Sequence, residues 1–127
     1  MALRGILTST VYVRIRKNEF QVRHIESGRE VRTRSQVPFT TQRLLVGDFV
    51  AAVDCLRQSL RDVRYGPRFL AAPTVVMHPL EMNEGGLSAI ERRALLELAE
   101  GAGGKIAMVW EGRELADSEV KEHARAA

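Results

Sequence analysis

The sequence predicts an α/β (α+β) domain in which helices pack on a mixed five-stranded sheet. Residues 11–34 contain three short segments in which apolar and polar residues alternate, as in half-buried strands. Residues 48–111 then contain two helix-and-strand units. The expected order is β-β-β-α-β-α-β, and three antiparallel strands followed by such units make one mixed sheet. At 127 residues, the chain is expected to form a single domain over 1–127.

The strongest local signal is a helix–glycine–strand unit over residues 88–111. Ser88 followed three residues later by Glu91 is a capping box, in which each side chain accepts a hydrogen bond from an N–H group at the helix start. Gly101 and Gly103 suit the left-handed conformation that ends helices, and the apolar run after them is typical of a buried strand. Residues at three- and four-residue steps predict one buried helix face: Ile90, Ala94, Leu95 and Leu98.

The preceding helix is expected to begin near Asp48, a favourable N-cap residue, and to end at Gly66-Pro67. The next strand is expected within residues 69–78, and a short polar helix over residues 117–126. Five apolar residues at spacings of four and three form a stripe that is better explained as core than as a cofactor pocket: Phe49, Val53, Leu56, Leu60 and Val63.

Basic residues are concentrated in the three-stranded meander. If the meander forms, several of them share its outer face with Tyr12, and phosphates of nucleic acid or anionic lipid are candidate ligands. A solvated face with interspersed glutamates is the simpler interpretation, because aromatic stacking partners are scarce. The candidate anion- or partner-binding residues are Arg14, Arg16, Lys17, Arg23, Arg32 and Arg34.

The net charge of +3 conceals opposite charges in the two halves of the chain. Residues 1–68 contain 13 Lys+Arg and 6 Asp+Glu, whereas residues 69–127 contain 6 and 10. This asymmetry favours head-to-tail self-association or an anionic partner. One cysteine excludes an internal disulfide and fits a cytoplasmic location. No apolar run approaches the roughly 18 residues that cross a bilayer, so no transmembrane segment is expected, while residues 1–7 suit at most a peripheral membrane contact.

The element order and several short segments resemble the actin superfamily, which has a ribonuclease-H-like fold. Residues 46–50 (Val-Gly-Asp-Phe-Val) precede one helix, residues 91–94 (Glu-Arg-Arg-Ala) lie in the next, and residues 101–103 (Gly-Ala-Gly) follow it. These segments look like subdomain IA of bacterial actin MreB, the rod-shape-determining protein. The resemblance covers residues 46–111 and implies a truncated actin-like domain concerned with cell shape or filaments.

The sequence departs from MreB at the positions that bind nucleotide. MreB-like ATPases carry Asp-Leu-Gly-Thr after the first strand, whereas residues 15–18 here are Ile-Arg-Lys-Asn. The second phosphate loop belongs to another domain, and this chain is too short to contain it. Glu111 resembles the family's water-positioning glutamate only with a one-residue gap, and Gly112 replaces the proline that follows it. The comparison therefore implies no ATPase activity and no cofactor.

Other catalytic patterns are also missing from the sequence. A ribonuclease-H-type nuclease needs a carboxylate on its first strand, and residues 11–16 contain none. His24, His78 and His123 lack the spacing of a zinc site, and the first two are expected at the surface or at strand ends. Cys55 has no adjacent base in the sequence and is expected to be a packed thiol.

Together these features predict a non-catalytic MreB/actin-like interaction domain. It would act by self-association or by docking on a larger partner such as an actin-like protein, in cell-shape or filament regulation. Loss of the usual neighbouring subdomains would leave apolar surface for another copy to cover, and open meander edges could pair with a second chain. The alternative is a basic nucleic-acid-binding module that uses the outer face of the meander, and a degraded enzyme of the same fold ranks third.

Overall fold

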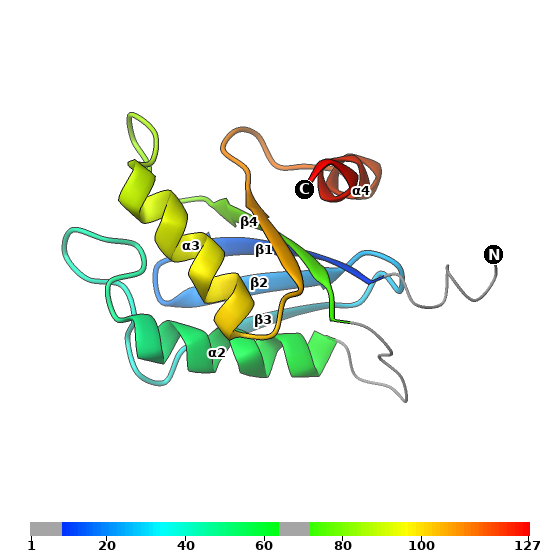
Figure 1. Ribbon diagram of the computed structural model, residues 1–127. Helices are drawn as coiled ribbons and strands as arrows, with labels where there is room; N and C mark the ends of the chain where they lie inside the picture. The colour runs from blue at the N-terminus through cyan, green and yellow to red at the C-terminus, as the bar shows by residue number, and fades with distance from the viewer. Residues whose placement is uncertain (1–8, 64–71) are drawn as a thin grey trace.

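The computed structural model describes residues 9–63 and 72–127. The expected helix end at Gly66-Pro67, the first part of the expected 69–78 strand and the apolar residues 1–7 lie outside these ranges. The predicted β-β-β-α-β-α-β order is confirmed, as is the terminal helix (Figure 1). The elements are β1 (Thr10–Arg16), β2 (Glu19–His24), β3 (Glu30–Arg34), α2 (Phe49–Val63), β4 (Thr74–Pro79), α3 (Ala89–Gly101), β5 (Ile106–Val109) and α4 (Asp117–Ala126).

The five strands form one mixed sheet in the order β3-β2-β1-β4-β5. β1 and β3 both run antiparallel to β2, whereas β4 runs parallel to β1 and β5 runs parallel to β4. Val13 marks the centre of the sheet, where it lies opposite Val22 on one side and Met77 on the other. The mixed five-stranded sheet predicted from the sequence is therefore confirmed.

The main hydrophobic core lies between the sheet and the two helices α2 and α3 (Figure 1). Val11, Val13 and Ile15 of β1 are fully buried there, because alternate residues of a strand point to the same face. The rings of Phe20 and Phe39 stack within this core, with centroids 4.8 Å apart. The stripe predicted on α2 faces the core from Val53 to Val63, but Phe49 at its start is 41% exposed.

α4 covers the opposite face of the sheet, over β1, β4 and β5. Its Val120 is fully buried against Tyr12 and Val76, and these residues form a second, smaller core. β1 is thus buried on both faces at its centre, rather than on one face as the alternation of polar and apolar residues predicts. The reason is tertiary: the terminal helix packs on a face that the strand sequence alone presents as polar.

α3 confirms its predicted start and corrects its predicted buried face. Both hydrogen bonds of the capping box are present between Ser88 and Glu91. Ile90 was expected to share the buried face, but it is 82% exposed, because it lies in the first helical turn beyond the cover of the sheet. Gly101 is still helical, and Gly103 alone of the two predicted glycines has positive φ.

β5 differs from the buried strand that its sequence predicts. Ile106 is 41% exposed, and Val109 is the one buried residue of this strand. β5 lies at one edge of the sheet, so one of its sides has no neighbouring strand within residues 9–63 and 72–127. An apolar run of four residues therefore marks an edge strand here.

Candidate functional site

The structure places five of the six predicted basic residues on one face of the meander. Because the side chains of Tyr12, Arg14 and Arg16 point away from α2 and α3, the cross-strand register brings β2 and β3 arginines onto the same face. Lys17 lies in the turn that follows β1. We call this surface the charged sheet face, and its basic residues are Arg14, Arg16, Arg23, Arg32 and Arg34.

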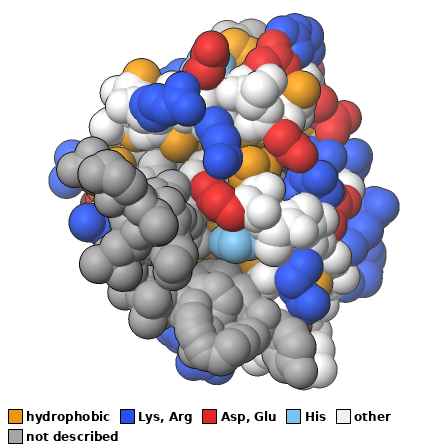
Figure 2. Space-filling model, turned by 90° about the vertical axis from the view of Figure 1, so that its right-hand side faces the viewer, with side chains coloured by type: hydrophobic (Ala, Val, Ile, Leu, Met, Phe, Trp, Pro, Cys, Tyr) orange, Lys and Arg blue, Asp and Glu red, His pale blue; other side chains and the backbone are white. Residues whose placement is uncertain are grey.

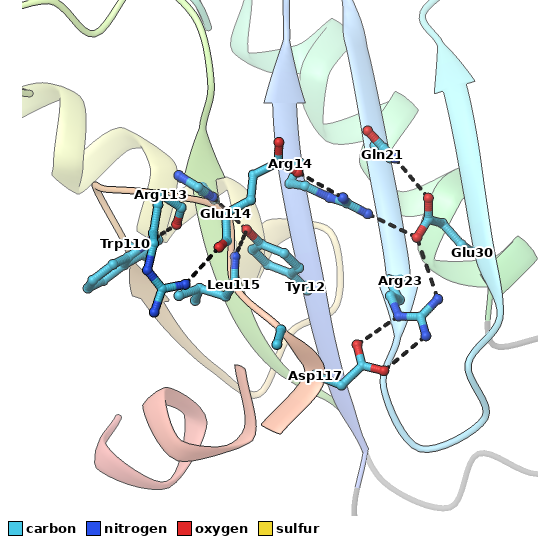
Figure 3. A network of polar contacts seen from close by, with 12 residues as sticks. Tyr12, Arg14, Gln21, Arg23, Glu30, Trp110, Arg113, Glu114, Leu115 and Asp117 are labelled. Atoms are coloured by element: carbon cyan, nitrogen blue, oxygen red, sulfur yellow. Dashed lines mark hydrogen bonds and ion pairs between the residues drawn. The ribbon is translucent and has the colours of Figure 1, made fainter. Parts of the chain in front are cut away.

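Acidic partners neutralise most of the charged sheet face (Figure 3). Arg14 donates to Glu30 at 2.9 Å and to Glu114 at 3.0 Å, and its guanidinium lies 5.1 Å from the centre of the Tyr12 ring. Arg23 makes two bonds to Asp117 at the start of α4, at 2.8 and 2.9 Å. The meander and the segment that leads into α4 are therefore joined by ion pairs.

The remaining arginines of this face have different environments. Arg32 and Arg34 share the carboxylate of Glu19, while no ion pair of Arg16 is found among the described residues. Arg14 Nε, Arg16 Nε and Gln21 Oε1 are buried and have no hydrogen-bond partner within the described part of the chain. A bound anion or water would accept hydrogen bonds from the two arginine Nε–H groups, whereas the Gln21 oxygen is an acceptor that water, but not an anion, would satisfy.

Two carboxyl groups of this face, Glu30 and Asp117, have lowered pKa values. Burial alone would raise the pKa of Glu30. Hydrogen bonds from Gln21 and the nearby positive charge of Arg14 lower it by more than burial raises it, so the pKa lies below its ordinary value. The hydrogen bonds from Arg23 likewise lower the pKa of Asp117. Near neutral pH, this face is thus a network of paired charges with a small excess of arginine.

A buried polar network lies beside the charged sheet face, under the segment that leads into α4. The hydroxyl oxygen of Tyr12 lies 2.6 Å from Nδ1 of His78, and it accepts a bond from the Leu115 N–H at 3.1 Å. His78 Nε2 lies 2.9 Å from the Gly112 carbonyl oxygen, to which it must donate. Nδ1 is then the acceptor, and the Tyr12 hydroxyl is the donor.

The two histidines expected at the surface or at strand ends both lie at strand ends, His24 as the last residue of β2 and His78 as the next-to-last residue of β4, and both are buried rather than at the surface. His78 is 1% exposed, because α4 and its preceding segment cover β4. Burial lowers the pKa of His78, and this keeps its ring neutral. His24 is 8% exposed and lies within 3.1 Å of Ser9 Oγ and 2.7 Å of Ser27 Oγ. Figure 2 shows the right-hand side of the molecule in Figure 1, where a histidine ring surfaces between acidic side chains and polar neighbours.

Cys55 is a buried thiol on α2, as the sequence predicts. Its Sγ lies 3.8 Å from the Thr33 carbonyl oxygen, and burial raises its pKa. An open cavity of about 370 Å³ lies beside it, between α2 and the end of β3. The charged residues of this cavity have partners elsewhere, since Arg34 pairs with Glu19 and Asp54 pairs with Arg57.

A small apolar groove lies where α3 begins, next to the carboxyl end of β4. Its volume is about 70 Å³, and its walls are the 44–46 segment, Pro79, Leu87 and the first two turns of α3. At its mouth, Leu44 is 41% exposed and Ile90 is 82% exposed. The sequence-based prediction placed Ile90 in the core and therefore missed this groove; the only available signal was its position one turn ahead of the other apolar residues.

Glu111 fixes one wall of this groove. Its Oε1 accepts a bond from the Leu87 N–H at 2.9 Å, and its Oε2 pairs with Arg92 of α3. Arg92 also donates to the carbonyl oxygen of Val109 at 3.4 Å. Both carboxylate oxygens are therefore engaged in joining the end of β5 to the start of α3.

The segments that carry the resemblance to MreB have local structural roles. Asp48 accepts a bond from the Ala51 N–H at 3.0 Å and caps α2. A side chain at Gly47 would collide with that of Thr41, so the tight loop requires glycine. In α3, Arg93 pairs with Glu97 one turn later at 3.1 Å. Helix capping, loop closure and surface pairing account for these residues.

The described residues lack two further kinds of site. Across 9–63 and 72–127, no three His, Cys, Asp or Glu side chains are grouped as metal ligands would be. No helix in these same ranges has the length and apolar character needed to span a bilayer.

These observations define an α+β domain with the element order of a ribonuclease-H-like fold, a paired charged sheet face and a small apolar groove. The sequence is 41% identical over 101 residues to the uncharacterized protein YjaA of Escherichia coli (strain K12), a match that covers 74% of this chain and 76% of the relative. The chain belongs to the YjaA family. No protein-family model matches the sequence.

Proposed function

We propose that the chain is a non-catalytic interaction domain whose groove receives apolar side chains of a larger protein partner. The observation that carries this proposal is the apolar groove at the start of α3, with Ile90 and Leu44 exposed at its mouth. Large apolar side chains that gather at an open groove are typical of protein contact sites. A groove flanked by a helix accepts anchor residues of a partner segment.

The size of the groove favours a protein partner over a metabolite. Sites for small molecules typically enclose about 300–1,000 Å³, whereas this groove encloses about 70 Å³. The tip of one or two aliphatic side chains fits such a space, but a nucleotide does not. Its single charged lining residue, Glu91, is already used in the capping box.

The actin-like resemblance suggests the biological setting of this contact. Subdomain IA of an actin-like protein packs against neighbouring subdomains, so a domain that resembles it has surface suited to contact with another protein domain. An actin-like protein that acts in cell shape or filament regulation is the partner class that this resemblance favours. In agreement with a non-catalytic role, the segment after β1 lacks the phosphate-binding aspartate, and Glu111 holds Leu87 and Arg92.

Photo-crosslinking from position 90 tests the proposed contact directly. A photo-reactive amino acid replaces Ile90 in cells, and the adduct is identified by mass spectrometry. The matched control carries the same amino acid at Arg93, which is exposed on the same helix but does not line the groove. We expect one dominant adduct from position 90, none of that mass from position 93, and its loss in a Leu44→Glu background.

Two results would overturn this proposal. The first is a pattern of adducts at position 90 that Leu44→Glu leaves unchanged, since a partner held by the groove must respond to a charge at its mouth. The second is robust magnesium-dependent ATP hydrolysis that belongs to the purified chain itself and not to a copurified contaminant. Identification of the partner as an actin-like protein would support the cell-shape setting as well as the contact.

A further inference from the structure

We propose that two copies of this chain pair antiparallel along β3 and continue the sheet across a two-fold axis. This inference rests on the proposed interaction role and names a second copy as the partner at an edge separate from the groove. Among the described residues, β3 is the last strand of the sheet on its side. An open strand edge presents N–H and C=O groups that pair readily with another strand.

The hydrogen bonds between β2 and β3 show which backbone groups of β3 face outward. The N–H of His24 donates to the carbonyl of Arg29 at 2.8 Å, and the N–H of Ser35 donates to the carbonyl of Asn18 at 2.9 Å. Hydrogen-bonded pairs alternate along an antiparallel ladder, so the odd-numbered residues of β3 bond to β2. The N–H and C=O groups of Glu30, Arg32 and Arg34 therefore point to the open edge.

The opposite edge of the sheet is less suited to pairing. β5 has only four residues, and the side chain of Arg92 occupies the carbonyl oxygen of Val109. β3 has five residues, all with exposed or half-exposed side chains, and every one of them is paired with β2. Among the described strands, β3 is thus the longer and more accessible edge.

The charges of β3 select one register for self-pairing. With the two-fold axis at Val31, Glu30 lies opposite Arg32 of the second copy, and Arg32 lies opposite Glu30 of the second copy. Both are hydrogen-bonded pairs, because these residues carry the outward backbone groups. The neighbouring register, centred on Arg32, would also place Glu30 opposite Arg34 of the second copy, but it sets the two Arg32 side chains directly opposite each other, and like charges at that position are unfavourable.

The side chains in the monomer leave room for these cross-strand pairs. Arg32 uses its Nε toward Glu19, and no partner of its terminal nitrogens is found among the described residues. Glu30 accepts from Arg14 and Gln21 on the side of β2, and a carboxylate has about four acceptor positions. A short strand pair buries less surface than a standard interface, so we expect a concentration-dependent dimer.

Sedimentation velocity over a concentration series tests the dimer with a matched pair of variants. Arg32→Glu and Arg34→Glu make the same charge change on neighbouring exposed residues that share Glu19. In the proposed register, only position 32 faces a charged residue, since position 34 faces Gly28 of the second copy. We expect the dissociation constant to rise at least about tenfold for Arg32→Glu and to change less than about threefold for Arg34→Glu.

A disulfide test locates the axis independently of the charges. In a Cys55→Ser background, Val31→Cys places two thiols directly opposite each other across the axis, whereas Thr33→Cys faces Arg29 of the second copy. Mild oxidation should give a covalent dimer with Val31→Cys and substantially less with Thr33→Cys. Circular dichroism confirms that each variant is folded before it is compared.

Three results would overturn the proposal. The first is a chain that stays monomeric at all concentrations up to about 1 mM. The second is a dimer that Arg34→Glu weakens and Arg32→Glu does not. The third is disulfide crosslinking that is more efficient with Thr33→Cys than with Val31→Cys. Failure here is distinguishable from failure of the groove proposal. If the chain is monomeric but still gives the Leu44-dependent adduct from position 90, only the β3 dimer proposal fails. If the β3 dimer forms but that adduct is absent, only the groove proposal fails.

Discussion

The hydroxyl oxygen of Tyr12 lies 2.6 Å from Nδ1 of His78, and this contact joins β1 to β4 beneath the segment that leads into α4. The two rings lie nearly parallel, with centroids 5.8 Å apart. Their outer atoms hold the backbone of that segment through the Gly112 carbonyl and the Leu115 N–H. A pair of central-strand residues thus fixes where the terminal helix docks.

Tyr12→Phe is expected to destabilise the protein by about 2–3 kcal/mol. The substitution keeps the ring in place but leaves His78 Nδ1 and the Leu115 N–H without a partner, and each buried unpaired group costs about 1–3 kcal/mol. Urea unfolding followed by circular dichroism measures the change. Tyr12 is 1% exposed, so water cannot easily replace the hydroxyl. A loss below about 0.5 kcal/mol would contradict the role given to this network.

The buried His78 predicts that stability falls as the solution becomes acidic. Burial lowers its pKa in the folded state below the ordinary value of about 6.5, although its bond to Gly112 acts in the opposite direction. Between the two pKa values the unfolded chain binds more protons, so the free energy of unfolding rises with pH in that window. The stability that the neutral His78 ring contributes is fully present above about pH 6.5 and is lost as the pH falls through the folded-state pKa.

His78→Gln provides the comparison for this pH dependence. Glutamine retains an amide donor for the Gly112 carbonyl but does not titrate. Charged groups near the ring, Arg14 and Glu114, are present in both proteins, as are the other two histidines. We expect the difference in unfolding free energy between wild type and variant to shrink between about pH 7 and pH 5. A difference that stays constant over this range would exclude His78 as the cause.

The sequence predicts the elements of this fold better than it predicts which faces are covered. Local chemistry defines where helices begin, so Ser88 and Asp48 mark the starts of α3 and α2 correctly. Strand alternation defines two faces but does not state whether a distant element covers the polar one. Tyr12 therefore reads as a surface residue beside arginines, although α4, more than 100 residues later, buries it.

The same limitation explains what was missed in the candidate site. The six basic residues were identified and five do share a face, but their acidic partners Glu114 and Asp117 come from the far end of the chain. Helical periodicity placed Ile90 on the buried stripe, and it is exposed because α3 starts beyond the sheet. Both features are tertiary: distant segments pair, and a helix begins beyond the edge of its sheet. No local sequence pattern contains this information.

Ser88→Ala is expected to lower stability by about 1 kcal/mol through loss of the α3 cap. Ser88 Oγ accepts from the Glu91 N–H at 3.1 Å, and Glu91 accepts from the Ser88 N–H at 2.9 Å. Ser118→Ala on α4 is the control, because this residue is exposed and does not cap its helix. Thermal unfolding of the two variants compares the same chemical change with and without a cap. Equal shifts in melting temperature would show that the capping box contributes nothing.

The paired charged sheet face predicts weak binding to nucleic acid at physiological salt. Four of its five arginines already contact carboxylates, so few of them are available to neutralise phosphates. Binding would therefore release few counterions from the nucleic acid, and this release is the main source of affinity. Fluorescence anisotropy with a labelled DNA duplex and a single strand, at about 0.05 and 0.15 M salt, measures this. Tight binding that falls steeply with salt and is lost when Arg14, Arg16, Arg32 and Arg34 become glutamine would favour the alternative function, a basic nucleic-acid-binding module.

Glu111 is expected to act as a tether rather than as a catalytic carboxylate. Its two oxygens hold the Leu87 N–H and Arg92, which connect the end of β5 to the loop and helix that line the groove. Glu111→Ala removes both contacts and should cost about 1–2 kcal/mol, whereas Glu111→Gln keeps an acceptor for Leu87 and should cost less.

The groove provides a second measurement for this residue. Because Leu87 forms one of its walls, Glu111→Ala should also reduce the adduct formed from the photo-reactive amino acid at position 90, and Glu111→Gln should reduce it less. Glu97→Ala is the control, since it removes an exposed carboxylate that pairs with Arg93 on the outer side of the same helix. If both Glu111 variants retain full stability and full adduct yield, the carboxylate does not support the groove, and a role for it in chemistry has to be reconsidered.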